Sequence, residues 1–563
     1  MTKYHEISRI RLSQLVWFVG PAATLMVNPW TNYDPVSVPK MLVLSIVALG
    51  ILGLFFSRKN LWQNQVPRLA LYISAGFISW MILALLFSGA DLSQQFWGYF
   101  GRNTGFITYF SLSLILLGTI SVSNLEFNVQ LLKVFLVSSI PMTGYCIIQY
   151  LKLDPVPWSE HFTFGTLGNV NFLSAYLGMV CIGLIVWSTN SEIRLFQRCS
   201  AIILAIVDFG LIISTGSIQG PIICIIGIAV FIFLKIRELN RFRRIAMLSY
   251  LAIMLVSISL LVLSLQDKGP LAKFIFQPSI LYRADYIHAG WAMTINKPFF
   301  GVGLDSYGEW YRQLRGLIST RRTGPDRISN TAHNIFLDIS SNGGIVLGLL
   351  YVSLVIYALF AAIRYLSRNK KSELYFNAFF SIWIAYQVQA LVSINQLGVG
   401  IWGWLFTGVL IGTLKKDDFV EVGKEQKKQI SKSRTAYKGS QLSPRDSIFL
   451  SLGLAVGFTL GLIPVNADMA YRKASASGNL AQIVEASNKL GSTQFHRELA
   501  LDFAMRQNLA DETKKIALDI VNRYPRNFFA WRVLSVATAN TEQERQGAAA
   551  IVRSLDPFNQ TLP

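Results

Sequence analysis

Charged residues are scarce in this chain, and acidic residues are scarcer than basic ones. Only 15% of its 563 residues are charged, whereas ordinary soluble domains carry about 25%. Asp and Glu number 31 against 51 Lys and Arg, which gives a formal net charge of +20. So low a charge content excludes a chain built only from soluble domains.

Cysteine and histidine are also rare, with four and five residues respectively. The cysteines lie within or beside apolar runs and not in the loops predicted to lie outside, so the sequence predicts no disulfide framework. His, Cys, Asp and Glu form no group with the spacing of a metal site, and we expect no metal. The four cysteines are Cys146, Cys181, Cys199 and Cys224.

Long apolar runs are what the chain has in abundance. A run of about 20 apolar residues with few charges crosses a bilayer as a helix, and runs such as 344–362 approach this length. The sequence therefore predicts an all-α, polytopic membrane protein with about thirteen transmembrane helices. The predicted spans lie near 12–29, 41–56, 69–87, 105–120, 131–150, 170–188, 199–214, 219–235, 245–265, 343–363, 375–393, 398–414 and 447–465.

Lys and Arg are unevenly distributed between the loops. With the N-terminus in the cytoplasm, the short outer loops hold only Lys40, Arg102 and Lys152, while the inner segment 415–446 alone holds nine basic residues. This asymmetry follows the positive-inside rule and predicts a cytoplasmic N-terminus with the C-terminal tail outside. The net charge then reflects topology and contact with membrane lipids, and we expect no nucleic-acid partner.

The topology divides the chain into four parts. Transmembrane helices one to nine occupy 1–265, a large outer loop occupies 266–342, helices ten to thirteen occupy 343–465 with the basic linker 415–446, and a tail occupies 466–563.

The tail has a helical pattern and a short internal echo. YPRN at 524–527 and DPFN at 556–559 are 32 residues apart, close to the 34-residue period of tetratricopeptide repeats. Two or three degenerate helical-hairpin repeats are predicted, with a generic helical tail as the alternative.

The unusual polar residues gather on one side of the predicted membrane. Gly-rich connections and most of the isolated ionisable residues fall in outer loops, which predicts a single site on the outer face. Glycine lets the backbone approach a ligand closely, while Asn and Arg supply hydrogen-bond donors. The segments are WGYFGRNTGF (97–106), FGTLGNVNFLSAY (164–176) with Asn169 and Asn171, STGSIQGP (214–221), and the large loop with Arg283, Arg321, Arg322 and His333.

The arginines indicate an anionic ligand. Guanidinium is always charged, and its fork of donors matches phosphate. On a predicted helix at 279–298, Arg283 shares a face with Ile287 and Trp291, and a charge on an apolar stripe needs an anionic partner. That partner could equally be Asp285 or a lipid phosphate. The other outer arginines could equally contact headgroups or solvent.

His333 stands in TAHNIFLDISSNGG (331–344), where the large loop returns to the membrane. TAHN has the pattern of a helix start with Thr331 or Asn334 as cap, so a structural role is one interpretation. The other is chemical, because a neutral imidazole at the membrane surface can take a proton from a hydroxyl.

Together these segments resemble the O-antigen ligase and polymerase superfamily over about residues 90–400. TAHNIFLDISSNGGIVLG is similar to a family element in which a His at the end of a large periplasmic loop is followed by ten residues and a Gly, here His333 and Gly344. RADYIHAGWAMTINKPFFGVGLDSYGEWY resembles the loop helix of the family, with Ile287 in place of a Leu. GRNTGF and GTLGNVNFLSAY also resemble family segments.

The resemblance implies a metal-independent glycosyltransferase of the GT-C type in a bacterial plasma (inner) membrane, without a cofactor. Such enzymes pass a glycan from undecaprenyl pyrophosphate to a lipid, glycan or protein hydroxyl on the periplasmic face. The implied catalytic residues are His333 and Arg283. Because a base at His333 must be neutral, we expect transfer to fall at acid pH, around the ordinary His pKa of about 6.5. The expected substrate-binding residues are Arg102, Arg321, Arg322, Asn169, Asn171 and Gly344.

One departure from the family pattern concerns the donor. Family members often carry an Arg in the short outer loop that here reads STGSIQGP. Either Arg102, Arg321 or Arg322 takes its place, or the donor is held differently.

Several functions fit these features. A ligase is the leading interpretation, with a repeat-unit polymerase on the same carrier or a protein O-oligosaccharyltransferase as alternatives. A polytopic transporter is the alternative from another class, but transporters place charged groups at the midplane, and Asp208 is the one carboxylate deep in a predicted span.

Overall fold

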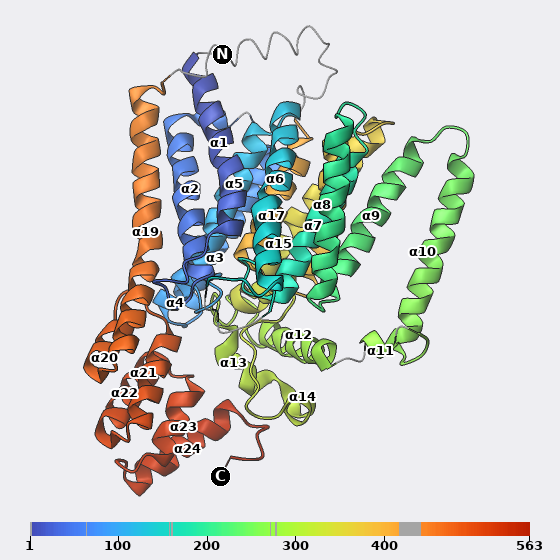
Figure 1. Cartoon of the computed structure of the whole chain (residues 1–563). Helices are drawn as coiled ribbons and strands as arrows, with labels where there is room; N and C mark the ends of the chain where they lie inside the picture. The colour runs from blue at the N-terminus through green and yellow to red at the C-terminus, as the bar shows by residue number, and fades with distance from the viewer. Residues whose placement is uncertain are drawn as a thin grey trace.

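The computed structural model describes residues 3–562 except 64, 157, 159–161, 271, 276–277 and 416–440. The described residues form an all-helical protein in which long apolar helices run side by side (Figure 1). The large loop and the tail lie at one end of this bundle, and α1 begins at the other end (Figure 1). The loop and the tail therefore lie on the same face of the bundle, and their predicted position outside the membrane stays a prediction. Most of the predicted linker 415–446 lies outside the described residues.

Each of the thirteen predicted spans lies on a helix in the described chain. Nine of these helices are long and apolar enough to cross a membrane, as expected for a polytopic membrane protein. The nine are α2 (Ser37–Ser57), α3 (Arg68–Phe87), α6 (Leu125–Tyr150), α7 (Val170–Ser188), α8 (Leu195–Ser214), α9 (Gln219–Glu238), α10 (Arg243–Leu265), α15 (Ile335–Arg368) and α19 (Pro444–Ser477); the other four are α1 (Lys3–Leu25), α5 (Phe106–Val122), α16 (Leu374–Ala390) and α17 (Leu397–Gly412).

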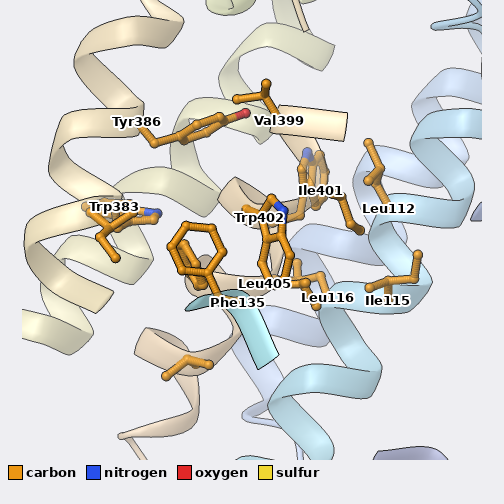
Figure 2. Close-up of a cluster of buried hydrophobic side chains, with 14 of the residues drawn as sticks. Leu112, Ile115, Leu116, Phe135, Trp383, Tyr386, Val399, Ile401, Trp402 and Leu405 are labelled. Atoms are coloured by element: carbon orange, nitrogen blue, oxygen red, sulfur yellow. The ribbon is translucent and has the colours of Figure 1, made fainter. Parts of the chain in front are cut away.

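The shorter helices form the centre of the bundle. Every residue of α17 is buried, as are nearly all residues of α5. Aromatic rings fill the space between α5, α6, α16 and α17, where the Phe135 and Trp402 rings meet edge to face with centroids 4.7 Å apart (Figure 2). In contrast, the apolar window of α10 is not buried at all within the protein, so this helix presents its side chains to lipid.

The large loop is a set of short helices beneath the bundle (Figure 1). They are α11 (Ala272–Ile275), α12 (Pro278–Asn296), α13 (Tyr307–Leu314) and α14 (Gly316–Thr323). The predicted loop helix at 279–298 is thus α12. α15 begins at Ile335, but it is two helical segments joined by a kink at Gly344, so the second segment begins where the predicted span at 343–363 begins.

The helix that contains the last predicted span continues into the tail without a break. α19 continues to Ser477, so the predicted boundary at 466 falls inside a helix. Consecutive tail helices then pack against each other as hairpins. The tetratricopeptide assignment remains a prediction. In the YPRN segment, Asn527 caps a helix by accepting from the Ala530 amide. The tail helices are α20 (Leu480–Ser487), α21 (Gln494–Arg506), α22 (Ala510–Arg523), α23 (Phe528–Val536) and α24 (Glu542–Leu555); the remaining short elements are η1 (Lys59–Leu61) and α4 (Leu92–Trp97).

A buried ion pair joins the tail to the large loop. Both Nη2 contacts from Arg315 to the two carboxylate oxygens of Asp556 are 2.8 Å long, and both side chains are fully buried. Arg312 adds a third contact to Asp556 at 3.2 Å. Because a charge in a buried site needs its partner, these contacts fix the end of α24 against the loop.

We therefore expect Asp556→Asn to destabilise the outer part of the protein by about 3–5 kcal/mol, since it leaves a buried guanidinium uncompensated. Thermal unfolding and limited proteolysis of the detergent-purified protein measure the effect. The matched control is Asp502→Asn, which removes an exposed pair with Arg506 and should cost less than about 1 kcal/mol. Equal effects of the two changes would contradict the docking of the tail through Asp556.

Candidate functional site

His333 lies immediately before α15, at the end of the large loop. Its backbone adopts a left-handed conformation with φ 50°, and its amide donates to Thr331 Oγ1 at 3.1 Å. The cap of α15 is Asn334, whose side chain accepts from the Leu337 amide at 3.0 Å. Of the two interpretations of TAHN, the capping role therefore belongs to Asn334 and not to His333.

The imidazole of His333 is half-buried beside the ring of Tyr286, with centroids 5.1 Å apart. No hydrogen bond joins it to a residue in the described part of the chain. Burial, together with the positive charges of Arg283 and Arg102, lowers the pKa of His333 to about 3. The ring is therefore neutral at physiological pH, as a general base requires.

Arg283 projects from α12 and is also half-buried. Within the described residues it has no carboxylate partner in ion-pair distance. Burial lowers its pKa from the ordinary value, although guanidinium remains charged. Asp285, the alternative partner, pairs with Arg322 at 3.1 Å instead. Arg283 is therefore a desolvated cation positioned near His333 and available to an anion.

The inward face of α12 differs from the predicted stripe. Trp291 is 60% exposed, whereas Ala289 and Met293 are fully buried. A shared inward face of Arg283, Ile287 and Trp291 is therefore wrong at Trp291, because α12 packs against α15 through a different face.

Arg102 is enclosed by carboxylates. Its Nη2 lies 2.9 Å from Asp338 and 3.5 Å from Asp305, and its side chain is 8% exposed. Its Nη1 also donates to the Asn330 carbonyl. The charge of Arg102 is thus shared with the protein, although it still acts on His333.

The two aspartates around Arg102 are site residues that sequence reasoning missed. Asp305 Oδ2 accepts from the amides of Tyr99 and Thr104 at 2.7 and 3.0 Å. Asp338 Oδ1 accepts from the Ala332 amide at 3.1 Å, one residue before His333. The sequence offered one signal for them, because the outer motifs GVGLDSYG and HNIFLD each contain one acidic residue.

Arg321 and Arg322 lie on α14, further from His333 along the loop. Arg322 is engaged by Asp285, and Arg321 is exposed. In the described structure no hydrogen bond or ion pair connects either of them to His333. The cations that act on His333 are Arg283 and Arg102.

Asn169 and Asn171 organise the start of α7. Asn169 caps this helix by accepting from the Asn171 amide at 2.8 Å, and Asn171 Oδ1 accepts from Ser217 Oγ at 2.8 Å. The predicted segments 164–176 and 214–221 therefore meet. Gly168 and Phe172 from the first of them line a cavity that Arg102 also lines, so GRNTGF and GTLGNVNF converge as expected.

Gly344 allows the large loop to dock on α15. Its φ of 86° and ψ of 169° break the helix, and the amide of the next residue, Ile345, donates to the Pro298 carbonyl at 2.8 Å. A Cβ at Gly344 would collide with the backbone carbonyl of Phe299. Gly344 thus permits a kink and close packing against the turn after α12, while its expected role in substrate binding stays a prediction.

No group of three or more His, Cys, Asp and Glu side chains in the described ranges could hold a metal ion. Around His333 the described structure brings together a neutral imidazole, the guanidinium of Arg283 without an ion pair, and the ion-paired cluster of Arg102.

We expect Gly344→Ala to destabilise the protein by about 1–3 kcal/mol, because this backbone conformation is almost restricted to glycine. The added carbon also collides with Phe299, which adds to this cost. Thermal unfolding of the purified protein provides the measurement. The control is Gly144→Ala in α6, where the added carbon meets no atom within 4 Å. A Gly344→Ala protein as stable as the control variant would show that the kink does not fix the loop.

Comparison with known proteins gives one family match. The model described as O-antigen ligase matches residues 200–352, a segment that contains Arg283, His333 and Gly344 but ends before α15 does. No curated protein matches the chain. The match supports the O-antigen ligase and polymerase superfamily for this segment, and it indicates a membrane enzyme of the glycosyltransferase or ligase type.

Proposed function

We propose that this protein transfers a glycan from a polyprenyl-pyrophosphate carrier, undecaprenyl pyrophosphate in a bacterial plasma membrane, to an acceptor hydroxyl at the periplasmic face. The observation that carries the proposal is the neutral imidazole of His333 beside the unpaired guanidinium of Arg283. Both residues lie within the segment that matches the family model.

The reaction needs little beyond these groups. The acceptor oxygen forms a bond to the anomeric carbon of the donor glycan, and the bond from that carbon to the pyrophosphate oxygen breaks. The proton of the acceptor hydroxyl goes to His333, and the carrier leaves as polyprenyl pyrophosphate. Because pyrophosphate is an anionic leaving group, a fixed cation stabilises the charge that develops on it.

Arg283 is the residue that we assign to the pyrophosphate. A desolvated guanidinium without a protein carboxylate binds an anion more strongly than one that is already paired. Arg102 is held by Asp305 and Asp338, so we assign it a positioning role. This answers the absence of an arginine from the 214–221 loop, since the donor is then held from α12.

Donor binding also activates the base. A histidine with a pKa of about 3 is a weak base in the empty site. Since Arg283 lowers this pKa, an anion bound at Arg283 must raise it, because the two electrostatic effects are coupled in both directions. His333 therefore becomes a stronger base when the donor is present, which disfavours reaction steps before the donor has bound.

A ligase is the form of the reaction that we favour. Transfer of a completed glycan to a lipid or protein needs one donor site and one acceptor site at the membrane surface. The tail is held against the large loop through Asp556 and lies at the same end of the bundle as the proposed site. Extension of the glycan on the same carrier would use identical chemistry, so the acceptor is decided by experiment.

The base is tested best by His333→Asn, because Asn tolerates the left-handed backbone that His333 adopts better than Ala does. We expect turnover of a polyprenyl-pyrophosphate glycan to fall by about 10²–10⁴-fold with thermal stability unchanged. His288→Asn, an exposed histidine on the same loop, is the matched control and should keep its activity. Near-normal turnover by a well-folded His333→Asn protein would remove the base from the mechanism.

A strain that carries only the His333→Asn protein separates ligase from polymerase. Full-length glycan accumulating on the carrier supports a ligase, whereas single repeat units on the carrier indicate a polymerase. A carrier profile equal to that of the wild-type strain would contradict both.

Arg283 is tested by charge and by geometry. We expect Arg283→Ala to lose more than tenfold in kcat/KM, about 1.4 kcal/mol of barrier, and Arg283→Lys to recover it poorly because the fork is lost. Arg532→Ala, an exposed tail residue, should be neutral. Full recovery by Lys would show that charge alone is sufficient.

The pH dependence follows from the lowered pKa. The active form of His333 is neutral, so activity persists above its pKa and is lost as the pH falls through it. The acid limb of kcat/KM, which reports the free enzyme, should lie near pH 3 rather than at the ordinary His value. The limb of kcat, measured with donor bound, should lie higher. A kcat/KM limb near pH 6.5 would contradict the buried, cation-flanked histidine.

A further inference from the structure

The helix that carries Arg283 has an apolar face that the described protein leaves uncovered. On one side of α12, Ala289 and Met293 are fully buried, where the helix packs against α13 and α15. On the other side, Trp291 and Ile295 are one helical turn apart, and they are 60% and 55% exposed. Apolar residues at this spacing form a continuous stripe along a helix. The two faces of α12 are therefore both apolar, and only one has a partner within the described residues.

The exposed stripe adjoins the apolar surface of a long helix of the bundle. Just after α12, Phe299 is 67% exposed, and its carbonyl accepts from Trp80 Nε1 of α3 at 3.1 Å. The next ring, Phe300, lies 5.5 Å from the ring of Phe87 at the end of α3. Phe87 is itself 61% exposed, on a helix long and apolar enough to span a membrane. The surface that α3 presents to lipid thus continues onto α12.

The position of α12 fits the surface of a bilayer. It runs across the direction of the long helices, at the end of the bundle that carries the large loop (Figure 1). The spanning window of α10 has no buried residue, and α10 extends along the bundle as far as α12 (Figure 1). Because a spanning helix matches the thickness of the hydrocarbon core, α12 lies at the level of the bilayer surface and parallel to it.

Lipid accounts for this stripe better than solvent or another protein does. Large apolar side chains in water are unfavourable in proportion to their exposed apolar area, whereas a helix that lies in the bilayer interface buries such a face in lipid. Trp is also enriched at this depth. A protein partner would have to cover the stripe and the adjoining lipid-facing end of α3 together, while lipid covers both without any further chain.

We propose that the stripe of Trp291, Ile295 and Phe299 is embedded in the bilayer leaflet on the side of the large loop, with lipid as its partner. Arg283 lies about two turns before Trp291 on the same helix. A helix held parallel to the bilayer therefore holds this guanidinium at the height of the lipid headgroups. The lipid contact stands by itself, whereas the use of this height to receive a lipid-linked pyrophosphate rests on the glycan transfer proposed above.

Nitroxide spin labels on full-length protein in a phosphatidylcholine nanodisc test this contact. Trp291→Cys and Ile295→Cys are labelled in a Cys199→Ser background, because Cys199 is the exposed one of the native cysteines. Collisions with oxygen report lipid, and collisions with a water-soluble nickel chelate report solvent. Val536→Cys is the matched control, since Val536 is apolar, 64% exposed and the last residue of α23, far from the bundle (Figure 1). Leu261→Cys on the lipid-facing helix α10 is the membrane reference.

We expect the ratio of oxygen to nickel collisions at Trp291→Cys and Ile295→Cys to be severalfold higher than at Val536→Cys and to approach that at Leu261→Cys. The two labels on α12 should also report the same depth, because the helix is parallel to the bilayer. A helix that stood upright would separate them by about 6 Å.

Two results would overturn the lipid contact. A ratio on α12 equal to that of Val536→Cys would place the stripe in water. Few collisions with either reagent would place it against a second copy of the chain or another protein. Depths that differ by about 6 Å would overturn the fixed height of Arg283. The measurement uses no glycan donor, so a failure of the proposed transfer would leave its result unchanged.

Discussion

The ion-paired cluster of Arg102, Asp305 and Asp338 is the interaction on which the geometry of the site depends. Each member comes from a different outer segment, and each is buried. A buried charge without its partner is strongly unfavourable, so the α4–α5 loop, the turn after α12 and the start of α15 can hold these charges only when they are together. Asp338 follows His333 in the chain and also accepts from the amide of Ala332, which precedes it. The cluster therefore holds the backbone on both sides of His333.

The same residue type has different roles because its surroundings differ. Arg102 is shared between two carboxylates, Arg322 is paired with Asp285, and Arg321 is exposed. Arg283 alone among these four is half-buried without an ion-pair partner in the described structure. A site that must bind a pyrophosphate needs one cation with unsatisfied donors, and it also needs surrounding charges that do not compete for the ligand. The division between Arg283 and Arg102 meets both requirements.

Local and periodic signals predicted a large part of this structure. Apolar runs located the helices of the bundle, and the periodic stretch at 279–298 located α12. These features depend on neighbours in sequence, so a single chain reveals them. The predicted inward face of α12 was incorrect at Trp291, which is exposed. The buried side of a surface helix depends on the element beneath it, which local sequence does not show.

Contacts between residues far apart in the sequence could not be predicted, because local patterns do not show which distant residues meet. Asp556 and Arg315 are separated by 241 residues, and no local pattern distinguishes Asp556 from other acidic residues in a soluble tail. The sequence indicated which face carries the site, but it did not indicate which polar side chains lack partners there.

The most direct test of the central claim is a structure of the purified protein with a polyprenyl-pyrophosphate donor bound, determined by electron microscopy in a lipid nanodisc. The account predicts pyrophosphate density in contact with Arg283 and next to His333, while Arg102 keeps its ion pairs with Asp305 and Asp338. Pyrophosphate bound to Arg102 in place of these aspartates, or bound away from Arg283, would contradict it.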